Sequence, residues 1–196
     1  MVSWRKIYEG IPDYGEADVL LNGYFQCNRH IDRDIAFEMF SPREETLQEI
    51  RRLYGDLSDH VCINVRRGDY LHFCKYGFRM LSKADIDNIL REHFQGWPCL
   101  FVSDDVEWCK ESFTGPQYRF ADKPCSYKPE VDLYLQTVCR GNVISNSSFS
   151  WWGAYLNEHT EKVVCPWPWF DEKKGPTPGL LPDGWVKFNT GLNLRP

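Results

Sequence analysis

From residue 60 onward, short apolar runs alternate with amphipathic segments, and this alternation constrains the fold more than any other feature of the chain. Apolar runs of strand length occupy residues 60–66, 99–103, 117–120, 142–145 and 162–165. Segments with helical spacing lie between them, near 83–94, 105–113, 130–140 and 148–158. Strands that alternate with helices favour a parallel sheet covered on both faces. We therefore predict an α/β fold with a doubly wound parallel sheet.

Capping signals predict where two helices begin. Ser82 and Asp85 have the spacing of a capping box ahead of the segment at 83–94. Ser41 is the expected N-cap of a further helix, because Pro42 suits the first helical position and acidic residues follow it.

The chain divides by composition into three predicted parts. Residues 1–55 hold turn-forming residues, an apolar run at 19–25 that predicts a strand, and a connecting helix. Residues 56–170 form the α/β domain. Residues 171–196 are rich in Pro and Gly and are expected to form a tail that wraps the surface.

The first apolar run ends in a charged segment, Arg66, Arg67, Gly68 and Asp69. Two adjacent guanidinium groups repel each other, and an anionic ligand relieves that repulsion; their planar donors suit phosphate oxygens. Gly68 lets the backbone turn and approach a ligand closely. One arginine can instead be structural, paired with Asp69 or another carboxylate, while the other faces the ligand. An Arg-Gly-Asp adhesion motif is disfavoured, because the tripeptide follows a buried strand.

The fourth run leads into Asn146, Ser147 and Ser148, which provide the second half of the predicted anion site. Backbone N–H groups at a helix start, together with serine hydroxyls, bind anions well. Simple N-capping explains one of the serines without any ligand. In a parallel sheet, ligands bind beyond the carboxyl ends of the strands, where these residues and the arginines meet.

Three acidic residues have more than one reading. Asp104 and Asp105 follow the second run, where they can recognise sugar hydroxyls, cap the next helix or begin a metal site. Asp132 is expected in the first turn of its helix, where the macrodipole favours it whether or not a ligand is present.

Composition limits the functional classes. The formal net charge of −5 argues against a nucleic-acid-binding surface. The eight cysteines include no C-x-x-C pair, and several sit in apolar runs, which indicates buried thiols in a reducing compartment rather than a zinc site. The sequence shows no signal-peptide core and no apolar run near the ~20 residues that span a bilayer, so a cytoplasmic location is expected.

Several segments resemble one family. Residues 64–70 (Asn-Val-Arg-Arg-Gly-Asp-Tyr) resemble the His-x-Arg-Arg-Gly-Asp-Tyr motif of the α-1,2-fucosyltransferases, glycosyltransferase family 11. Residues 132–135 followed by 144–156 resemble the family's second signature almost residue for residue. Residues 101–108 and 23–26 are similar to its middle block and its Gly-Tyr-aromatic-Gln segment.

The resemblance implies a GT-B fold, of which this chain is the Rossmann-like donor-binding half with an incomplete amino-terminal half. It implies inverting transfer of L-fucose from GDP-β-L-fucose to the 2-hydroxyl of a galactoside glycan, with no metal and no cofactor. By the same resemblance, Arg66 contacts the β-phosphate, Ser147 or Ser148 assists it, and Asp132 is a candidate for the guanine edge.

In such a transfer, charge grows on the leaving β-phosphate, and Arg66 is placed to stabilise it. Asp69 is the nearest acidic candidate for a general base, although it can instead only orient an arginine. The full set of predicted donor-binding residues is Asn64, Arg66, Arg67, Gly68, Asp104, Asp105, Asp132, Asn146, Ser147 and Ser148.

Two departures from the family pattern affect what is expected. Asn64 replaces the motif histidine, which changes the side chain offered to nucleotide or acceptor. The family's Gly-Gly-Leu-Gly-Asn-Gln-Leu-Phe start is not found, so most of the acceptor-side half is expected to be missing. The alternatives to an active transferase are therefore an inactive nucleotide-sugar-binding remnant, one piece of a split enzyme completed by a partner chain, and a hydrolase. Peripheral association with a membrane is a further open reading.

Overall fold

The computed structural model describes residues 15–16, 27–73, 79–125, 128–170, 177 and 179–190. The chain splits into two compact units, Met1–Ser41 with Pro176–Gly184, and Pro42–Gly175 with Trp185–Pro196. The first unit contains the 3-10 helix η1 (Asn28–His30) and helix α2 (Arg33–Phe40). The strand predicted at 19–25 lies outside the described residues.

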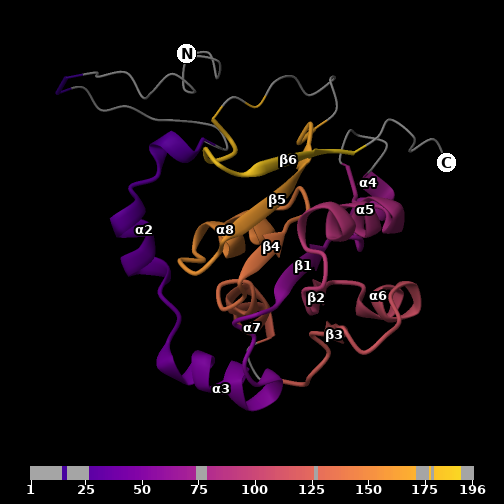
Figure 1. Ribbon diagram of the computed structural model, residues 1–196. Coiled ribbons are helices and arrows are strands. Elements are labelled where there is room, and N and C mark those ends of the chain that lie inside the picture. The colour runs from indigo at the N-terminus through magenta and orange to yellow at the C-terminus, as the bar shows by residue number, and fades with distance from the viewer. Residues whose placement is uncertain are drawn as a thin grey trace. The chain divides into compact units, whose positions relative to one another are not determined.

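The second unit is built on a parallel sheet of six strands in the order β3-β2-β1-β4-β5-β6 (Figure 1). The strands are β1 (Val61–Val65), β2 (Cys99–Ser103), β3 (Tyr118–Phe120), β4 (Gly141–Val143), β5 (Lys162–Trp167) and β6 (Val186–Asn189). The strand order reverses between β1 and β4, as in doubly wound nucleotide-binding sheets, where ligands bind at that reversal. The predicted Rossmann-like parallel sheet is confirmed.

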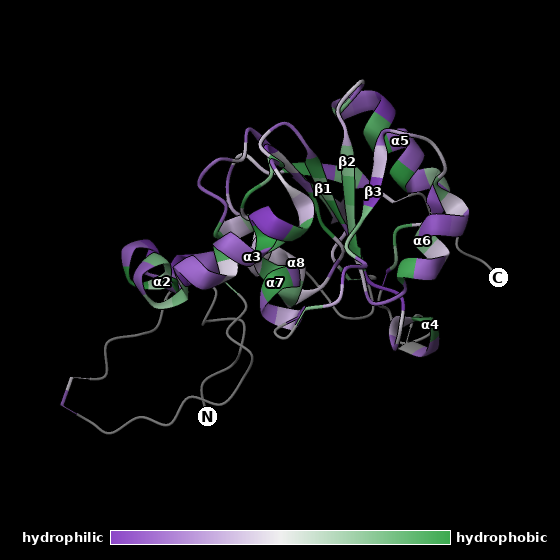
Figure 2. Ribbon diagram, turned by 90° about the horizontal axis from the view of Figure 1, so that it is seen from below, coloured by the Kyte–Doolittle hydropathy of each residue, from purple (hydrophilic) through white to green (hydrophobic). Residues whose placement is uncertain are grey.

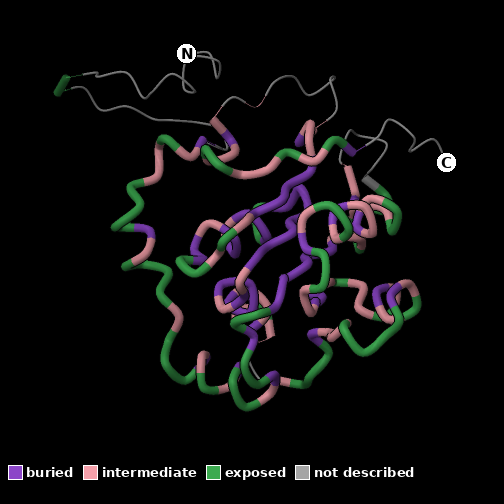
Figure 3. Tube along the Cα trace, viewed as in Figure 1, coloured by how far each residue is buried: buried purple, intermediate pink, exposed green. Residues whose placement is uncertain are grey.

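Helices cover both faces of this sheet. They are α3 (Glu44–Tyr54), α4 (Tyr70–Phe73), α5 (Lys83–His93), α6 (Val106–Ser112), α7 (Lys128–Leu135) and α8 (Ser148–Tyr155). The central strands are buried along their length, whereas the helices expose one side to solvent (Figure 3). No helix in the described part of the chain is long and apolar enough to cross a bilayer.

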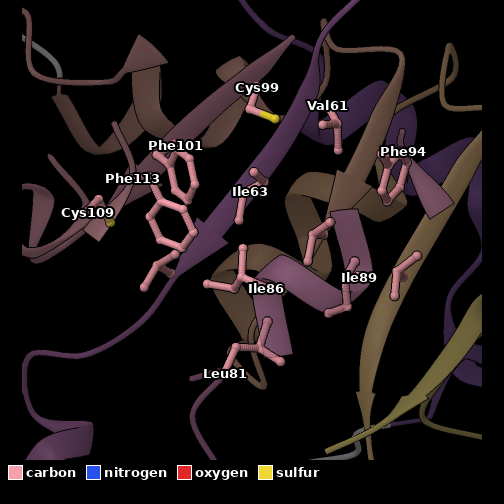
Figure 4. Packing of buried hydrophobic residues seen from close by; sticks show 13 residues of the cluster. Val61, Ile63, Leu81, Ile86, Ile89, Phe94, Cys99, Phe101, Cys109 and Phe113 are labelled. Atoms are coloured by element: carbon pink, nitrogen blue, oxygen red, sulfur yellow. The ribbon is translucent and has the colours of Figure 1, made fainter. Parts of the chain in front are cut away.

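Alternation along β1 sends its side chains to two separate cores. Ile63 and its neighbours two residues away face α5, where they pack on Ile86 and Ile89 (Figure 4). On the same face, the rings of Phe101 and Phe113 stack at 4.5 Å between centroids. Cys62 points to the opposite core, with residues of α3 and α7. Both faces of β1 and β2 therefore pack in hydrophobic cores, and Figure 2 colours most residues of the two strands as hydrophobic.

Two helix starts test the capping predictions. The capping box of Ser82 and Asp85 is present at the start of α5 and is confirmed. The prediction that Ser41 caps α3 is wrong, because that helix begins at Glu44 with Arg43 as N-cap. Ser41 instead ends α2, and its hydroxyl donates to the Phe37 carbonyl at 2.6 Å.

Two further predictions are corrected. The expected tail includes strand β6, which pairs with β5 and packs Val186 and Phe188 against the core of α5.

Helix α7 begins at Lys128, because Pro129 fits its first turn rather than preceding it. Asp132 is therefore the fifth residue of α7 and not in its first turn, so the macrodipole does not explain its position.

Candidate active site

A cavity of about 260 Å³ lies where β1 and β2 end and α7 and α8 begin. Of the predicted residues, five line it: Asn64, Arg66, Asp104, Asp132 and Ser147. The remaining lining residues are Val65, Val102, Ser103, Lys128, Pro129 and Phe149. The structure thus brings together the charged end of β1 and the start of α8 at the sheet's switch point, and we call this cavity the rim pocket.

Arg66 follows the last residue of β1 and is held by two carboxylates. Its guanidinium nitrogens lie 2.7 Å from Asp69 Oδ1 and 3.0 Å from Asp104 Oδ2. The guanidinium is partly exposed at the pocket. Two anions fix its orientation, and its remaining donors are available to an incoming anionic ligand.

Asp104 organises the whole loop after β1. One carboxylate oxygen accepts from the Arg67 backbone N–H at 2.8 Å, and the other pairs with Arg66. A Cβ atom at Gly68 would lie 2.6 Å from Asp104 Oδ2. Gly68 is therefore needed for close approach of this carboxylate.

Arg67 takes part in a different cluster and is not among the residues that line the rim pocket. Its Nε lies 3.0 Å from Asp105 Oδ2, and its guanidinium lies 4.0 Å from the ring centroid of Trp108. Asp105 also caps α6, accepting from the Trp108 N–H at 3.3 Å. The capping reading of the acidic pair thus applies to Asp105.

Asn64 is buried at the end of β1 and is held by serines that the sequence reading missed. Its Oδ1 accepts from the Ser145 hydroxyl at 2.9 Å. Ser145 and Ser150 lie 3.1 Å apart through their hydroxyl oxygens, and Ser150 donates to the Ser145 carbonyl at 2.9 Å. With Oδ1 engaged, the Asn64 NH₂ is the group left for the pocket.

The start of α8 places its polar residues in three different environments. Ser147 is the N-cap and accepts from the Phe149 N–H at 3.3 Å. Ser148 is the exposed first residue of the helix. Asn146 is buried and donates to the Trp169 carbonyl at 3.0 Å, so it supports the loop rather than lining the pocket.

A lysine absent from the predicted set, Lys128, also lines the rim pocket. Lys128 Nζ is 2.8 Å from Asp132 Oδ1 and 2.8 Å from the Ala121 carbonyl. Burial raises the pKa of the Asp132 carboxyl above its usual range, and the hydrogen bond from Lys128 partly offsets that rise. The only sequence signal for Lys128 was its spacing of four residues from Asp132.

No group of three His, Cys, Asp or Glu side chains suited to a metal ion occurs among the described residues. Asp104 and Asp105, the acidic pair considered for a metal, are both bound to arginines. The cysteines that the structure describes are free, and all but Cys125 are buried; the burial of Cys62, Cys99, Cys139 and Cys165 was predicted from the apolar runs around them.

Residues 14–186 match the sequence profile described as Glycosyl transferase family 11. The chain belongs to this family. It is 33% identical to the O-antigen biosynthesis glycosyltransferase WbnK of Escherichia coli, over 86% of this chain and 60% of that protein. It is 32% identical to an α-1,2-colitosyltransferase of Escherichia coli, over 85% of this chain and 61% of the relative.

The chain is also similar to animal proteins. It is 26% identical to galactoside α-(1,2)-fucosyltransferase 1 of Leontocebus fuscicollis, over 97% of this chain and 60% of that protein. This family 11 chain therefore spans about 60% of the length of these curated relatives. Among solved structures, fucosyltransferase NodZ from Bradyrhizobium is similar with a TM-score of 0.42 and 15% identity, over 62% of this chain and 43% of NodZ.

Proposed function

We propose that this family 11 chain takes part in the transfer of L-fucose from GDP-β-L-fucose to the 2-hydroxyl of a galactoside, with inversion. The observation that carries the proposal is the rim pocket, in which Arg66 and the capped start of α8 line one cavity at the switch point of the sheet. Family membership and relatives named for α-1,2 transfer support the same reaction class.

Arg66 acts on the leaving group in this proposal. As the acceptor hydroxyl attacks the anomeric carbon, negative charge accumulates on the β-phosphate of the departing GDP. A guanidinium held in place by Asp69 and Asp104 needs little reorganisation to meet that charge. The start of α8, whose N-cap Ser147 lines the pocket and is followed by the exposed Ser148, supplies neutral donors.

Asp69 has the geometry of an orienting residue. Its carboxylate lies 2.7 Å from Arg66 and is about half exposed. A general base at this position would exchange its ion pair for the acceptor hydroxyl during each turnover. The proposal assigns Asp69 to positioning Arg66, and a base role for Asp69 remains the alternative.

The donor sugar has a second candidate. Colitose is L-fucose without its 3-hydroxyl, and one relative is named a colitosyltransferase. The two donors share the nucleotide and the scissile bond, so the rim pocket is suited to either. Assays with both GDP sugars decide which one the chain accepts.

Calorimetry with GDP, combined with a transfer assay on the same sample, tests the proposal. We expect GDP binding by the wild type and a loss of about tenfold or more for Arg66→Ala, since a charge-assisted hydrogen bond contributes roughly 1.5–3 kcal/mol. Asn64→His should have a smaller effect. Arg52→Ala is the matched control, because Arg52 pairs with Glu49 on the surface of α3 at 2.7 Å.

The outcomes separate the rival readings. GDP binding without transfer to any galactoside would favour the nucleotide-sugar-binding remnant or a piece of a split enzyme. No GDP binding at millimolar concentration would contradict the proposal. Release of free sugar from the donor at the full rate of its consumption would favour a hydrolase.

A further inference from the structure

The pair of Lys128 and Asp132 is distinguished from a surface pair of the same spacing, Lys83 and Asp87, by its place in the rim pocket. Lys128 is the first residue of α7, where the macrodipole disfavours a cation. A lysine four residues before an aspartate is also the less favourable order for a helical ion pair. The pair is nevertheless closed at 2.8 Å and lines the pocket. Lys83 and Asp87 close in the same way at the start of α5, so it is the location in the pocket, and not the pairing, that points to a role for Lys128 and Asp132.

The pair presents a fixed pattern of donors and acceptors. The Lys128 ammonium has three N–H donors, and two of them are used on Asp132 and on the Ala121 carbonyl. Only Lys128 bonds to the Asp132 carboxylate among the described residues, so the second oxygen of that carboxylate is available. The pair therefore offers a ligand one N–H donor of Lys128 beside at least one carboxylate oxygen of Asp132.

This pattern suits a neutral polar edge better than a phosphate. The Lys128 ammonium keeps one N–H donor for a ligand, whereas the guanidinium of Arg66, which is also paired with carboxylates, keeps up to three for phosphate oxygens. A lactam edge, C=O beside N–H, matches an ammonium beside a carboxylate without repulsion. The phosphates are better served at the other part of the pocket, by Arg66 and the start of α8.

The walls around the pair suit a flat ring. Val102, Pro129 and Phe149 supply apolar surface, and Phe149 is partly exposed in the first turn of α8. The volume of about 260 Å³ lies just below the roughly 300–1,000 Å³ typical of sites for whole drug-sized ligands. The cavity is therefore smaller than a whole nucleotide sugar, and the rest of the donor must extend beyond it.

We infer that Lys128 is a specificity-determining residue of the donor site, which reads the 6-oxo group of a purine while Asp132 accepts from N1–H and the 2-amino group. The inference rests on the proposed function and adds Lys128 to it. Adenine reverses both partners at this edge, with an amino group facing Lys128 and a bare N1 facing Asp132. Uracil offers a carbonyl and an N–H, but its second carbonyl faces the carboxylate.

Affinities for GDP, IDP, ADP and UDP, measured by calorimetry on the wild type and on Lys128→Met, test this assignment. We expect the wild type to prefer GDP over IDP, which lacks the 2-amino group, and IDP over ADP. Lys128→Met should weaken GDP and IDP by about tenfold, weaken UDP less because its second carbonyl already opposes binding, and leave ADP within about twofold. Lys123→Met is the matched control, an exposed lysine on the connection that leads to α7.

A gain of binding provides a second test that a folding defect cannot mimic. Asp132→Asn replaces one acceptor with an NH₂ donor, which suits the 2-oxo group of xanthine. The variant should bind XDP more tightly than the wild type does, by about tenfold, while losing affinity for GDP. The ratio of two affinities does not depend on the folded fraction of the sample.

The results divide clearly. Equal weakening of all four nucleotides by Lys128→Met would place Lys128 on the phosphates and overturn the base-reading role. Unchanged selectivity in both variants would overturn it as well, while leaving the proposed transfer intact. No GDP binding by the wild type would overturn both the inference and the proposed function.

Discussion

At the scale of single residues, position 68 in the loop after β1 has no room for a side chain. A Cβ atom there would lie 2.6 Å from Asp104 Oδ2, and this carboxylate holds both Arg66 and the Arg67 N–H. Gly68→Ala should therefore displace Asp104 and weaken GDP binding by about tenfold, roughly 1.4 kcal/mol. Calorimetry on purified variants measures the effect.

A double-mutant cycle supplies the control. In an Asp104→Ala background the clash is gone, so adding Gly68→Ala should change GDP affinity by less than about twofold. Additive losses in the two variants would show that Gly68 acts through the backbone rather than through Asp104.

We expect the ionised Asp132 carboxylate to lower the stability of the folded protein, while it serves the proposed binding of the base. Its pKa in the folded protein is raised, chiefly by burial, above the value of about 3.9 in an unfolded chain. Between these two values the folded state retains a proton that the unfolded chain has lost, so stability falls as pH rises through that window. At neutral pH the ionised carboxylate carries the full cost. Asp132→Asn should therefore unfold at a higher temperature than the wild type at pH 7.

The pH dependence checks this mechanism. The advantage of Asp132→Asn should shrink as pH falls below the raised pKa and disappear below about 3.9. Asp87→Asn is the matched control, because Asp87 also pairs with a lysine four residues earlier, Lys83, but on the surface at 2.6 Å. Thermal melts across pH that show the same shift for both variants would contradict a burial effect.

The residues that sequence reasoning found and missed differ in one physical respect. Arg66 and Asp104 directly follow β1 and β2, and Ser147 lies in the short connection between β4 and α8, so knowing the strands was enough to bring them to one edge. Lys128 lies at the start of a helix, and its approach to the pocket depends on where α7 packs, which local patterns do not specify. The bond between Ser145 and Asn64 spans 81 residues and likewise required the fold.

At the scale of elements, the capping box of α5 should contribute to stability without affecting the site. The Ser82 hydroxyl oxygen accepts from the Asp85 N–H at 3.1 Å, and Asp85 accepts from the Ser82 N–H at 2.9 Å. Ser82→Ala should lower the free energy of unfolding by about 1 kcal/mol and leave GDP affinity unchanged. Ser112→Ala, at the end of α6, should stay within about 0.5 kcal/mol of the wild type in the same denaturation experiment.

Helices and strands were predicted well where a long stretch of local sequence specified them, and less well where their structure depended on contacts with distant residues. Helix α5 has a complete capping box and a regular apolar face, and its bounds were predicted within one residue. Strand β6 has four residues, and its strand character depends on pairing with β5 in the folded sheet. Ser41 and Pro42 carried a valid start signal for α3, but the Ser41 hydroxyl bonds back to α2 instead.

At the scale of the whole molecule, the formal net charge of −5 means that an anionic donor must be drawn by local cations. At the rim pocket of the sheet-bearing unit the cations are Arg66 and Lys128, and the start of α8 adds neutral donors to the same pocket. Arg66 and the start of α8 follow β1 and β4, which lie on the two sides of the switch point. The strand order therefore brings them together although they are far apart in the sequence.

The same arrangement predicts how the protein responds to chelation. A divalent cation needs several oxygen ligands, and the acidic pair nearest the pocket is already committed, with Asp104 bound to the loop of Arg66 and Asp105 bound to Arg67. The charge that grows on the leaving phosphate is met by Arg66. GDP binding and any transfer should therefore persist in excess EDTA, with dissociation constants and rates unchanged within about twofold.

The control adds manganese or magnesium to a chelated and dialysed sample. Because chelation should not weaken GDP binding or transfer, the added ion should not increase either of them. If chelation abolished binding and a divalent ion recovered it, Asp104 and Asp105 would have to leave their arginines to act as ligands, and Arg66 could not be the principal group that neutralises the phosphate.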